Sequence, residues 1–592
     1  MVNIPTVPPS IYETGVFVQP LAPIGDSLIG SFFVGLIPLL LVFVLLGICR
    51  IPAHFASLAG LVICIFIAIF GWGMPAAQAF SSIANGIVFA NWPIMWIVVS
   101  SMFLYNISVY SGIFDMFRRW MLVYTPPDKR VILLIIGYCF GSVLEGVAGF
   151  GVPGAICSPL MVSLGFDPMD ALVYTLIFDT TPVAFGALGT PITTLATITG
   201  LPAMKLSAMI GRQLPLLSVF LPLYVLGMYA GVQAGVVECW PMALVSGLSF
   251  AATQAIFANL VGPELPDLIA GLVSLGCLVA FVQMWKPVYR SEYHAIMTQL
   301  PKKPDEKITE LEKTNQCGKY IPTLPNTNLE KGSEISDTEA ITRKQVILAW
   351  TPWTIIVVVV LIWTFAHVSS VGQVNVKWPA LHQKVYLTLY GKNYDAVWIF
   401  QPLGTGTAIF ISAIIFGGVV LWNGSNPSIF WMALRETFIQ LYRPIITVSF
   451  IMGFAYLYNY SGKFSSIVYT IGLTFSSVGP AFPFLSAWLG WIACFLSGSD
   501  TSANSLFGNL QVVAAREIGL SGILMAATNS SGAIASKMIS PQNMSTIAST
   551  INLQGKEGLA LRRTIFHSVF IVCIVGAIAC IQQYCIPSMI PS

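Results

Sequence analysis

Charged side chains are scarce in this chain. Only 9% of its 592 residues are Asp, Glu, Lys or Arg, whereas 56% are hydrophobic. An ordinary soluble domain contains roughly 25% charged residues, so this composition excludes one. The net charge of +3 is too small to indicate a nucleic-acid partner. Composition therefore predicts an all-α polytopic membrane protein that is surrounded by the lipid bilayer.

The chain also lacks the motifs of catalysis and metal binding. Its 11 cysteines and five histidines form no CxxC or Cys/His cluster, and there is no Walker motif or nucleophile–base arrangement. We therefore predict no metal site, no cofactor and no enzymatic activity. An intramembrane aspartyl protease that pairs Asp179 with Asp500 is the alternative. Asp500 follows Leu-Ser-Gly-Ser and not the Gly-x-Gly that such proteases carry, which argues against this alternative.

Long apolar runs indicate the membrane segments. Runs of about 20 residues, enough to cross a bilayer, lie near 28–49, 52–72, 91–110, 213–236, 241–258, 266–285, 346–366, 397–422, 444–460 and 564–587. Hydrophobicity continues with interruptions around 131–200 and 464–550. Depending on whether the interruptions are crossings or re-entrant hairpins, we expect about 12 to 15 membrane segments.

Charge distribution divides the chain into four parts. Residues 1–27 contain no Lys or Arg and are predicted to be extracytoplasmic, and a first membrane half follows at 28–285. Residues 286–345 read as a polar cytoplasmic linker, which is too short and too polar for the signalling domain of a sensor. The second membrane half is 346–592. These features predict a multi-pass protein of the plasma membrane.

The two halves resemble each other. The run at 110–114 recurs at 460–464, Asp179 falls on Asn529, and Pro191 falls on Pro541. One repeat enters the membrane where the other leaves it, because basic residues follow the run at 91–110 but precede the run at 444–460. We therefore predict two inverted repeats with broken or re-entrant helices, as in secondary transporters.

The first interrupted segment, 141–154, holds five glycines and one proline in 14 residues. Interior Gly and Pro cost about 1 and 3 kcal/mol relative to Ala, so a helix should break here. Backbone N–H groups freed by the break would suit a carboxylate ligand, which makes Gly149, Phe150 and Gly151 candidates for substrate binding. Glu145 lies in the same segment and is a candidate proton-coupling residue. Its alternative role is to hydrogen-bond the neighbouring backbone.

The second interrupted segment, 496–509, carries hydroxyl, amide or carboxylate groups on eight of its 14 residues, so it should face an interior cavity. Asp500 is a second candidate for the proton or for a coupling ion. Candidates for neutral hydrogen bonds to a substrate are Ser499, Thr501, Ser502 and Asn504. A purely structural strip of hydrogen bonds between helices is the alternative.

A third pair of polar segments surrounds Asp179 and its counterpart. Asp179 is a further candidate for the proton, and Asn529, Ser530, Ser531 and Gln542 are candidates for substrate binding. Lys537 is the only Lys or Arg between Arg516 and Lys556. Its ammonium needs an anionic partner, which is Asp500, Asp179 or the carboxylate of a transported anion.

Five strings spread along the chain resemble signatures of the L-lactate permease family. They are LEGVAGFGVP at 144–153, TPVAFGALG at 181–189, GPELPD at 262–267, GSDTSAN at 498–504 and KMISPQ at 537–542. The resemblance implies proton-coupled uptake of L-lactate, with D-lactate and glycolate as related substrates. The alternatives are a carrier of another organic anion or one coupled to Na⁺. Glu264 and Asp267 are expected in an extracytoplasmic turn.

Overall fold

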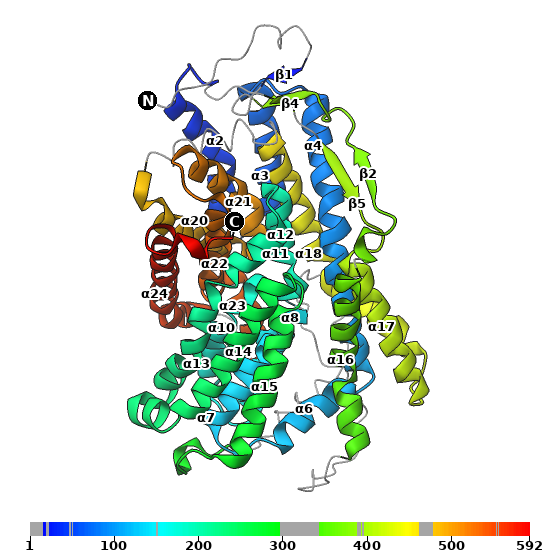
Figure 1. Ribbon diagram of the computed structural model, residues 1–592, viewed down its shortest axis with the longest axis vertical. Coiled ribbons are helices and arrows are strands. Elements are labelled where there is room, and N and C mark those ends of the chain that lie inside the picture. Colours follow the sequence, from blue (N-terminus) through cyan, green and yellow to red (C-terminus); the bar gives the residue numbers. More distant parts are fainter. Residues whose placement is uncertain are drawn as a thin grey trace, which may run out of the picture.

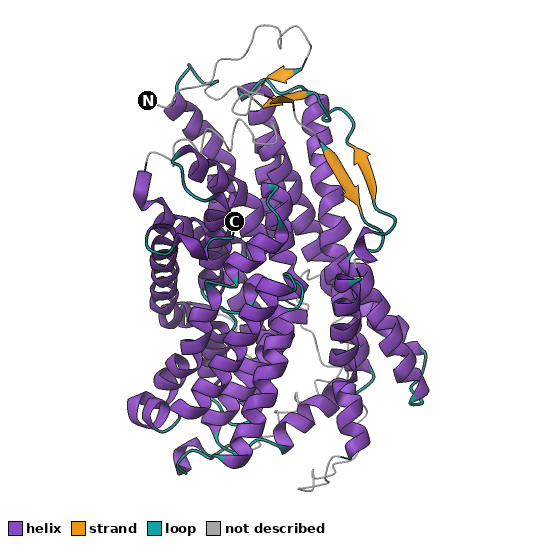
Figure 2. Cartoon of the chain, in the orientation of Figure 1, coloured by secondary structure: helices purple, strands orange, loops and turns teal. Residues whose placement is uncertain are grey.

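The computed structural model describes the chain except for a few segments. The described residues are 16–18, 23–45, 49, 51, 53–147, 149, 152–295, 342–366, 368–387, 392–393, 396–460, 478–551, 553 and 556–591. Helices dominate, and the strands gather at one end of the molecule (Figure 2). The predicted linker lies mostly outside the described residues, so its expected disorder stays a prediction.

The helices form two bundles that do not coincide with the two halves of the sequence (Figure 1). We call the first the flanking bundle. It comprises α2 (Leu28–Phe43), α3 (Ala53–Phe66), η2 (Ile67–Gly71), α4 (Ala76–Phe89), η3 (Ala90–Met95), α5 (Trp96–Tyr110), α6 (Ile113–Val123), α16 (Arg343–Phe365), α17 (Thr405–Trp422) and α18 (Ser428–Tyr460). Each half of the chain therefore opens with helices of this bundle.

The second bundle, which we call the site bundle, also takes helices from both halves. From the first half come α7 (Lys129–Ile132), η4 (Leu133–Phe140), α8 (Gly141–Val147), α9 (Val152–Ser163), α10 (Pro168–Phe178), η5 (Val183–Phe185), α11 (Gly186–Thr199), α12 (Ala203–Ile210), α13 (Leu214–Gly231), η6 (Val232–Val237), α14 (Trp240–Leu260) and α15 (Pro266–Met284). From the second half come α20 (Phe482–Ser497), α21 (Asp500–Glu517), α22 (Gly522–Lys537), α23 (Pro541–Thr550) and α24 (Glu557–Tyr584).

The two bundles meet mainly where α5, η3 and α18 pack against α8, α11 and α21. Packing within each bundle is more extensive, for example between α20 and α22 or between α4 and α18. Small residues allow the close approaches. A Cβ atom on Gly490 would lie 1.9 Å from the carbonyl oxygen of Asn529, so α20 and α22 touch backbone to backbone at a glycine.

Five short strands, which the sequence did not predict, form two small sheets. β1 (Phe17–Val18) pairs in parallel with β3 (Val385–Leu387), which pairs antiparallel with β4 (Lys392–Asn393). β2 (Val374–Lys377) pairs antiparallel with β5 (Val397–Phe400). β5 occupies the start of the apolar run expected at 397–422, so that run begins as a strand and becomes helical only at Thr405.

The membrane-spanning elements largely follow the predicted runs. Ten described helices are long and apolar enough to cross a bilayer, or eleven if the bent pair Pro168–Phe178 and Val183–Thr199 is one span. Besides these, three shorter apolar helices are described, which are Ile29–Val42, Pro153–Val162 and Gly479–Phe495. α4 was missed because Gln78, Ser82 and Asn85 interrupt its hydrophobicity, yet all three are buried.

The N-terminal strand and the start of the second half lie at opposite ends of the molecule. β1 and the strands of the second half lie at one end, and the start of α16 lies at the other with α6 and α7 (Figure 1). Arg130, which is fully buried, donates to Asp128 at 2.7 Å and to Glu238 at 3.0 Å, and Arg290 binds Glu238 at 2.7 Å. This clasp ties the chain leaving α15 to the base of the site bundle.

Candidate functional site

Both predicted interruptions are real breaks, and they meet at one cavity with a third break that the sequence did not predict. α8 ends at Val147 and α9 begins at Val152, with Gly149 in the left-handed region at φ +59°. α20 and α21 are separated by Gly498 and Ser499, with Gly498 at φ +68°. The axes of α10 and the α11 segment differ by 67°. Broken helices inside a membrane protein are tolerated where they line a cavity, as here.

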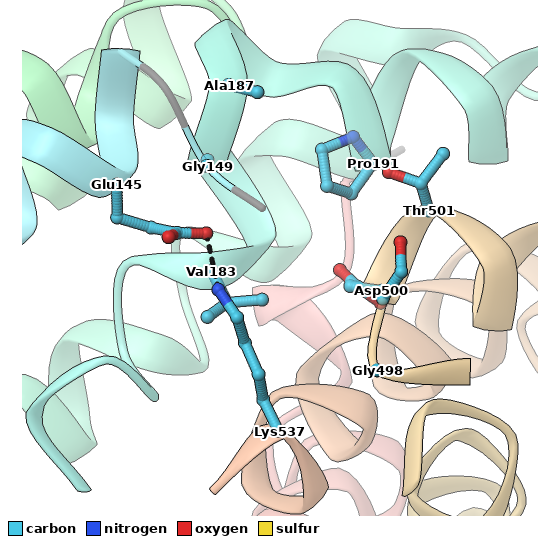
Figure 3. Close-up of a pocket in the computed structure, with 11 residues that line it drawn as sticks. Glu145, Gly149, Val183, Ala187, Pro191, Gly498, Asp500, Thr501 and Lys537 are labelled. Atoms are coloured by element: carbon cyan, nitrogen blue, oxygen red, sulfur yellow. Dashed lines mark hydrogen bonds and ion pairs between the residues drawn. The ribbon is translucent and has the colours of Figure 1, made fainter. Parts of the chain in front are cut away.

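The cavity and the open solvent at its mouth together make up about 340 Å³ of space not filled by atoms. Its lining combines acidic, basic and hydroxyl side chains with small apolar ones (Figure 3). The lining residues are Glu145, Gly149, Val183, Gly186, Ala187, Pro191, Gly498, Ser499, Asp500, Thr501 and Lys537.

Lys537 forms ion pairs with two acidic residues at the cavity. Its Nζ lies 2.7 Å from Glu145 Oε1 and 2.9 Å from Asp179 Oδ2. All three side chains are buried, with exposures of 3%, 3% and 8% for Lys537, Glu145 and Asp179. The predicted pairing of Lys537 with Asp179 is confirmed. The pairing with Glu145 was not predicted, because nothing in the local sequence connects the two.

The position of each charge on its helix explains part of this arrangement. Lys537 is the last residue of α22, where the helix dipole favours a cation. Asp179 caps the C-terminus of α10 and Glu145 lies near the C-terminus of α8, where the dipole disfavours an anion. The ammonium therefore relieves two carboxylates that their own helices destabilise.

Asp500, the other acid considered as a partner of Lys537, forms no ion pair with it in the described structure. It opens α21, where the helix N-terminus favours an anion. Its Oδ2 accepts a hydrogen bond of 2.5 Å from Ser530 Oγ. Figure 3 shows Asp500 on the side of the cavity opposite Glu145, with Lys537 directed to Glu145. The site thus has two acidic sides, and only one of them carries the cation.

The predicted polar residues divide into those that line the cavity and those that stand behind it. Ser499 and Thr501 line it, whereas Ser502 is buried and its backbone N–H donates to Ser499 Oγ at 3.4 Å. Behind the lining, Asn504 Nδ2 donates to Ser530 Oγ at 3.2 Å. Asn529 Nδ2 donates to Asn504 Oδ1 at 2.9 Å. These residues therefore support Asp500 rather than face the cavity.

The remaining predicted residues lie in three places. Ser531 Oγ turns away from the cavity and donates to Gln213 Oε1 at 2.6 Å. Gly149 lines the cavity. Phe150 and Gly151 fall outside the described residues, as does the side chain of Gln542 in α23.

Some site residues gave no polar signal in the sequence. Val183 and Ala187 line the cavity with small apolar side chains that look like ordinary membrane residues. Gly186 is a packing requirement, because a Cβ atom there would lie 2.6 Å from Glu145 Oε1. Ala187, Leu188 and Gly189 all have left-handed backbone, at φ +43°, +53° and +75°. Backbone strain of this kind gathers at functional sites.

The expected extracytoplasmic turn at Glu264 and Asp267 needs correction. Asp267 lies in the first turn of α15 and is fully buried. Gln254 Nε2 donates to its Oδ1 at 2.7 Å and to the carbonyl oxygen of Thr181 at 3.2 Å. Pro266 and Asp267 thus start a buried helix beside the bend that follows α10, and an amide from α14 binds one oxygen of the carboxylate.

Comparison with known proteins gives consistent matches over nearly the whole chain. The family model described as L-lactate permease matches residues 31–586. The glycolate permease GlcA of Escherichia coli strain K12 is 39% identical, over 95% of this chain and 97% of that protein. The L-lactate permease of Bacillus subtilis is 38% identical, over 97% of this chain and 99% of that protein.

Among solved structures, the YdaH transporter of Alcanivorax borkumensis covers 85% of this chain and 87% of its own. Its TM-score is 0.41 at 12% sequence identity.

Proposed function

This chain belongs to the L-lactate permease family, and on that premise we propose that it is a proton-coupled symporter of L-lactate and related small 2-hydroxymonocarboxylates such as D-lactate and glycolate. It is a multi-pass membrane transporter and not an enzyme. We further propose that it lies in the plasma membrane with an extracytoplasmic N-terminus. The placement of β1 and the start of α16 at opposite ends of the molecule supports that orientation (Figure 1).

The proposal rests on one observation, which is that Lys537 is ion-paired with two buried acids. A monocarboxylate that enters the cavity meets one cation among the lining residues, and that cation already neutralises Glu145 and Asp179. The substrate carboxylate can therefore bind Lys537 only if the ammonium gives up part of its ion pairing with those two acids. A buried carboxylate that loses its cation is costly, about 3 to 5 kcal/mol for a broken buried pair.

A proton removes that cost. When the substrate shares Lys537, a proton bound to Glu145 or Asp179 neutralises the carboxylate left without its cation. When the substrate leaves, Lys537 returns to both acids and the proton is released. Substrate and proton therefore bind together and leave together, which is the requirement for symport.

The charge balance of the cavity supports this coupling. Glu145, Asp179 and Asp500 are three buried acids, and Lys537 is the single described cation that contacts any of them. With every group ionised, two negative charges would lie uncompensated in a low-dielectric interior. The Asp267 carboxylate is buried nearby as well, so protonation of the acids inside the site bundle would relieve still more uncompensated negative charge.

Alternating access follows from the two bundles. Each half of the chain contributes first to the flanking bundle and then to the site bundle, which is the order expected of two structural repeats. Every charged residue of the cavity belongs to the site bundle. We therefore propose that the site bundle moves as a unit against α5, η3 and α18 and carries the substrate with it.

The function is tested by uptake of labelled L-lactate into proteoliposomes with an imposed pH gradient, acidic on the substrate side. We expect accumulation above equilibrium, its abolition by a protonophore, and competition by D-lactate and glycolate. Accumulation that follows a Na⁺ gradient and ignores the pH gradient would instead establish sodium coupling. Competition by other organic anions without any uptake of lactate or glycolate would establish a different substrate.

A further inference from the structure

The two acidic sides of the cavity differ in charge, because only one of them holds a cation. On one side Glu145 binds Lys537, which supplies the positive charge. On the other side Asp500 faces the cavity without a cation (Figure 3). A second carboxylate does not help to bind an anion through charge. Its position therefore calls for a hydrogen-bond donor on the ligand.

Asp500 is held in one orientation. Its exposure is 2%, and its Oδ2 accepts a hydrogen bond of 2.5 Å from Ser530 Oγ. Ser530 is in turn held by Asn504 Nδ2 at 3.2 Å, and the same amide donates to the carbonyl oxygen of Pro191 at 3.2 Å. This chain of contacts links α21, α22 and α11, so the carboxylate cannot turn without disturbing three helices.

The other oxygen of Asp500, Oδ1, is buried and has no hydrogen-bond partner among the described residues. Glu145 Oε2 and Asp179 Oδ1 are open in the same way, but those two carboxylates bind Lys537 through their other oxygens, whereas Asp500 binds no cation. Buried polar atoms are nearly always satisfied, so an open acceptor in a ligand cavity indicates a donor on the ligand. A role as helix cap does not explain Asp500, because Ser499 is the N-cap of α21 and its Oγ accepts from the Ser502 N–H.

We propose that Asp500 Oδ1 accepts a hydrogen bond from the 2-hydroxyl group of the substrate while Lys537 binds the substrate carboxylate. The inference rests on the proposed function and adds the residue that selects 2-hydroxy acids. A 2-oxo acid presents only lone pairs to Asp500, and an unsubstituted acid presents a C–H bond. Either ligand leaves the buried acceptor unpaired, and sites built to bind a hydroxyl reject such analogues strongly.

The native protein provides the first test and needs no variant. Exchange of internal labelled L-lactate is measured without a pH gradient, with L-lactate, pyruvate, propionate or 2-fluoropropionate outside. The fluoro acid keeps the shape of lactate but cannot donate. We expect each of the three analogues to require at least about tenfold higher concentration than L-lactate for half-maximal exchange. Equal potency of 2-fluoropropionate and L-lactate would overturn the proposal.

Asp500→Asn provides the second test. The amide oxygen can accept from Ser530, which turns the NH₂ group toward the cavity and replaces an acceptor by a donor. We expect the preference for L-lactate over pyruvate to fall by at least about tenfold. Glu517→Gln, at the exposed far end of the same helix, is the matched control and should keep the native preference.

Three outcomes distinguish this inference from others. If Asp500 only carries the coupling proton, Asp500→Asn lowers accumulation of both substrates and leaves their ratio in exchange unchanged, which overturns the inference. Ser530→Ala keeps the carboxylate but removes its support, and it should weaken the same discrimination in a folded protein even if Asp500→Asn fails to fold. If the native protein exchanges no 2-hydroxy acid at all, the proposed function itself fails.

Discussion

The ammonium of Lys537 donates a hydrogen bond of 2.7 Å to Glu145 Oε1 across 392 residues of sequence. It joins the end of α22, in the second half of the chain, to α8 in the first. The same nitrogen lies 2.9 Å from Asp179 Oδ2. The site therefore exists only when both halves are folded together, and its charge balance depends on one lysine.

Lys537→Met should lose lactate binding and also lose stability. Methionine keeps the apolar stem but removes the charge, so Glu145 and Asp179 remain buried without a cation. The expected cost is about 3 to 5 kcal/mol of unfolding free energy. Thermal unfolding in detergent measures the stability, and equilibrium binding of labelled lactate measures the site.

The control for Lys537→Met is Lys377→Met on the exposed strand β2, which should change neither the thermal stability nor the affinity for lactate. Adding Glu145→Gln and Asp179→Asn to Lys537→Met should restore stability without restoring binding, because the neutral site keeps no cation for the substrate. A stable Lys537→Met protein with native lactate affinity would contradict both the structural and the binding role.

Glu145→Gln should abolish accumulation driven by a pH gradient but retain exchange of internal for external lactate. Exchange does not require the empty carrier to return, and therefore does not require release of the proton. Measurement of both reactions in the same proteoliposomes separates the two effects. If Glu145→Gln still accumulates lactate, the proton resides on Asp179, and Asp179→Asn should then show the defect.

Gly186→Ala should impair transport although it adds only a methyl group and changes none of the charged residues. The new Cβ would lie 2.6 Å from Glu145 Oε1 and 3.2 Å from its Cδ, so the carboxylate must move away from Lys537. We expect at least about a tenfold loss of initial uptake rate, equivalent to about 1.4 kcal/mol. Gly276→Ala is the matched helical control, because its Cβ meets nothing within 4 Å.

Acidification should weaken the clasp around Glu238. The hydrogen bond from Arg290 lowers the pKa of Glu238 below its ordinary value of 4.5, partial desolvation opposes this effect, and the hydrogen bond from Arg130 adds to it. Because the folded pKa is the lower one, the stabilisation is present above pH 4.5 and is lost as the pH falls further.

The comparison with Glu238→Gln measures this effect. At neutral pH the native protein should have the higher Tm, and the difference should shrink when the pH falls below about 4.5. A difference that stays constant between pH 7 and pH 4 would show that the charge of Glu238 does not stabilise the clasp.

A bridge between the bundles should arrest transport. Ser505 Oγ of α21 lies 3.0 Å from Met452 Sδ of α18, directly across the contact between the bundles. Cysteines at both positions, joined by an oxidant or by Hg²⁺, would fix the site bundle against the flanking bundle. We expect uptake to stop and to recover with a reductant or thiol. The native chain and both single variants, treated identically, should be unaffected, whereas full activity of the bridged protein would exclude movement at this contact.

Much of this protein is determined by local features of its sequence. Scarce charge and long apolar runs indicated the membrane class, and glycines with one proline predicted the break around Gly149. Glu145, Asp500 and Lys537 stood out because a charge within an apolar segment is a property of that segment alone. All three line the cavity.

Only the tertiary structure decided how these residues are used. Lys537 pairs with Glu145 and Asp179 rather than with Asp500, because the ends of α8, α10 and α22 converge at its ammonium. The positions of these residues in the sequence carry no information on that convergence. Asn504 and Ser530 hydrogen-bond each other, and Ser530 binds Asp500, because α21 and α22 turn them together. Val183 and Ala187 became cavity walls through packing, since an apolar side chain has no local signal that separates a ligand cavity from the interior or from lipid.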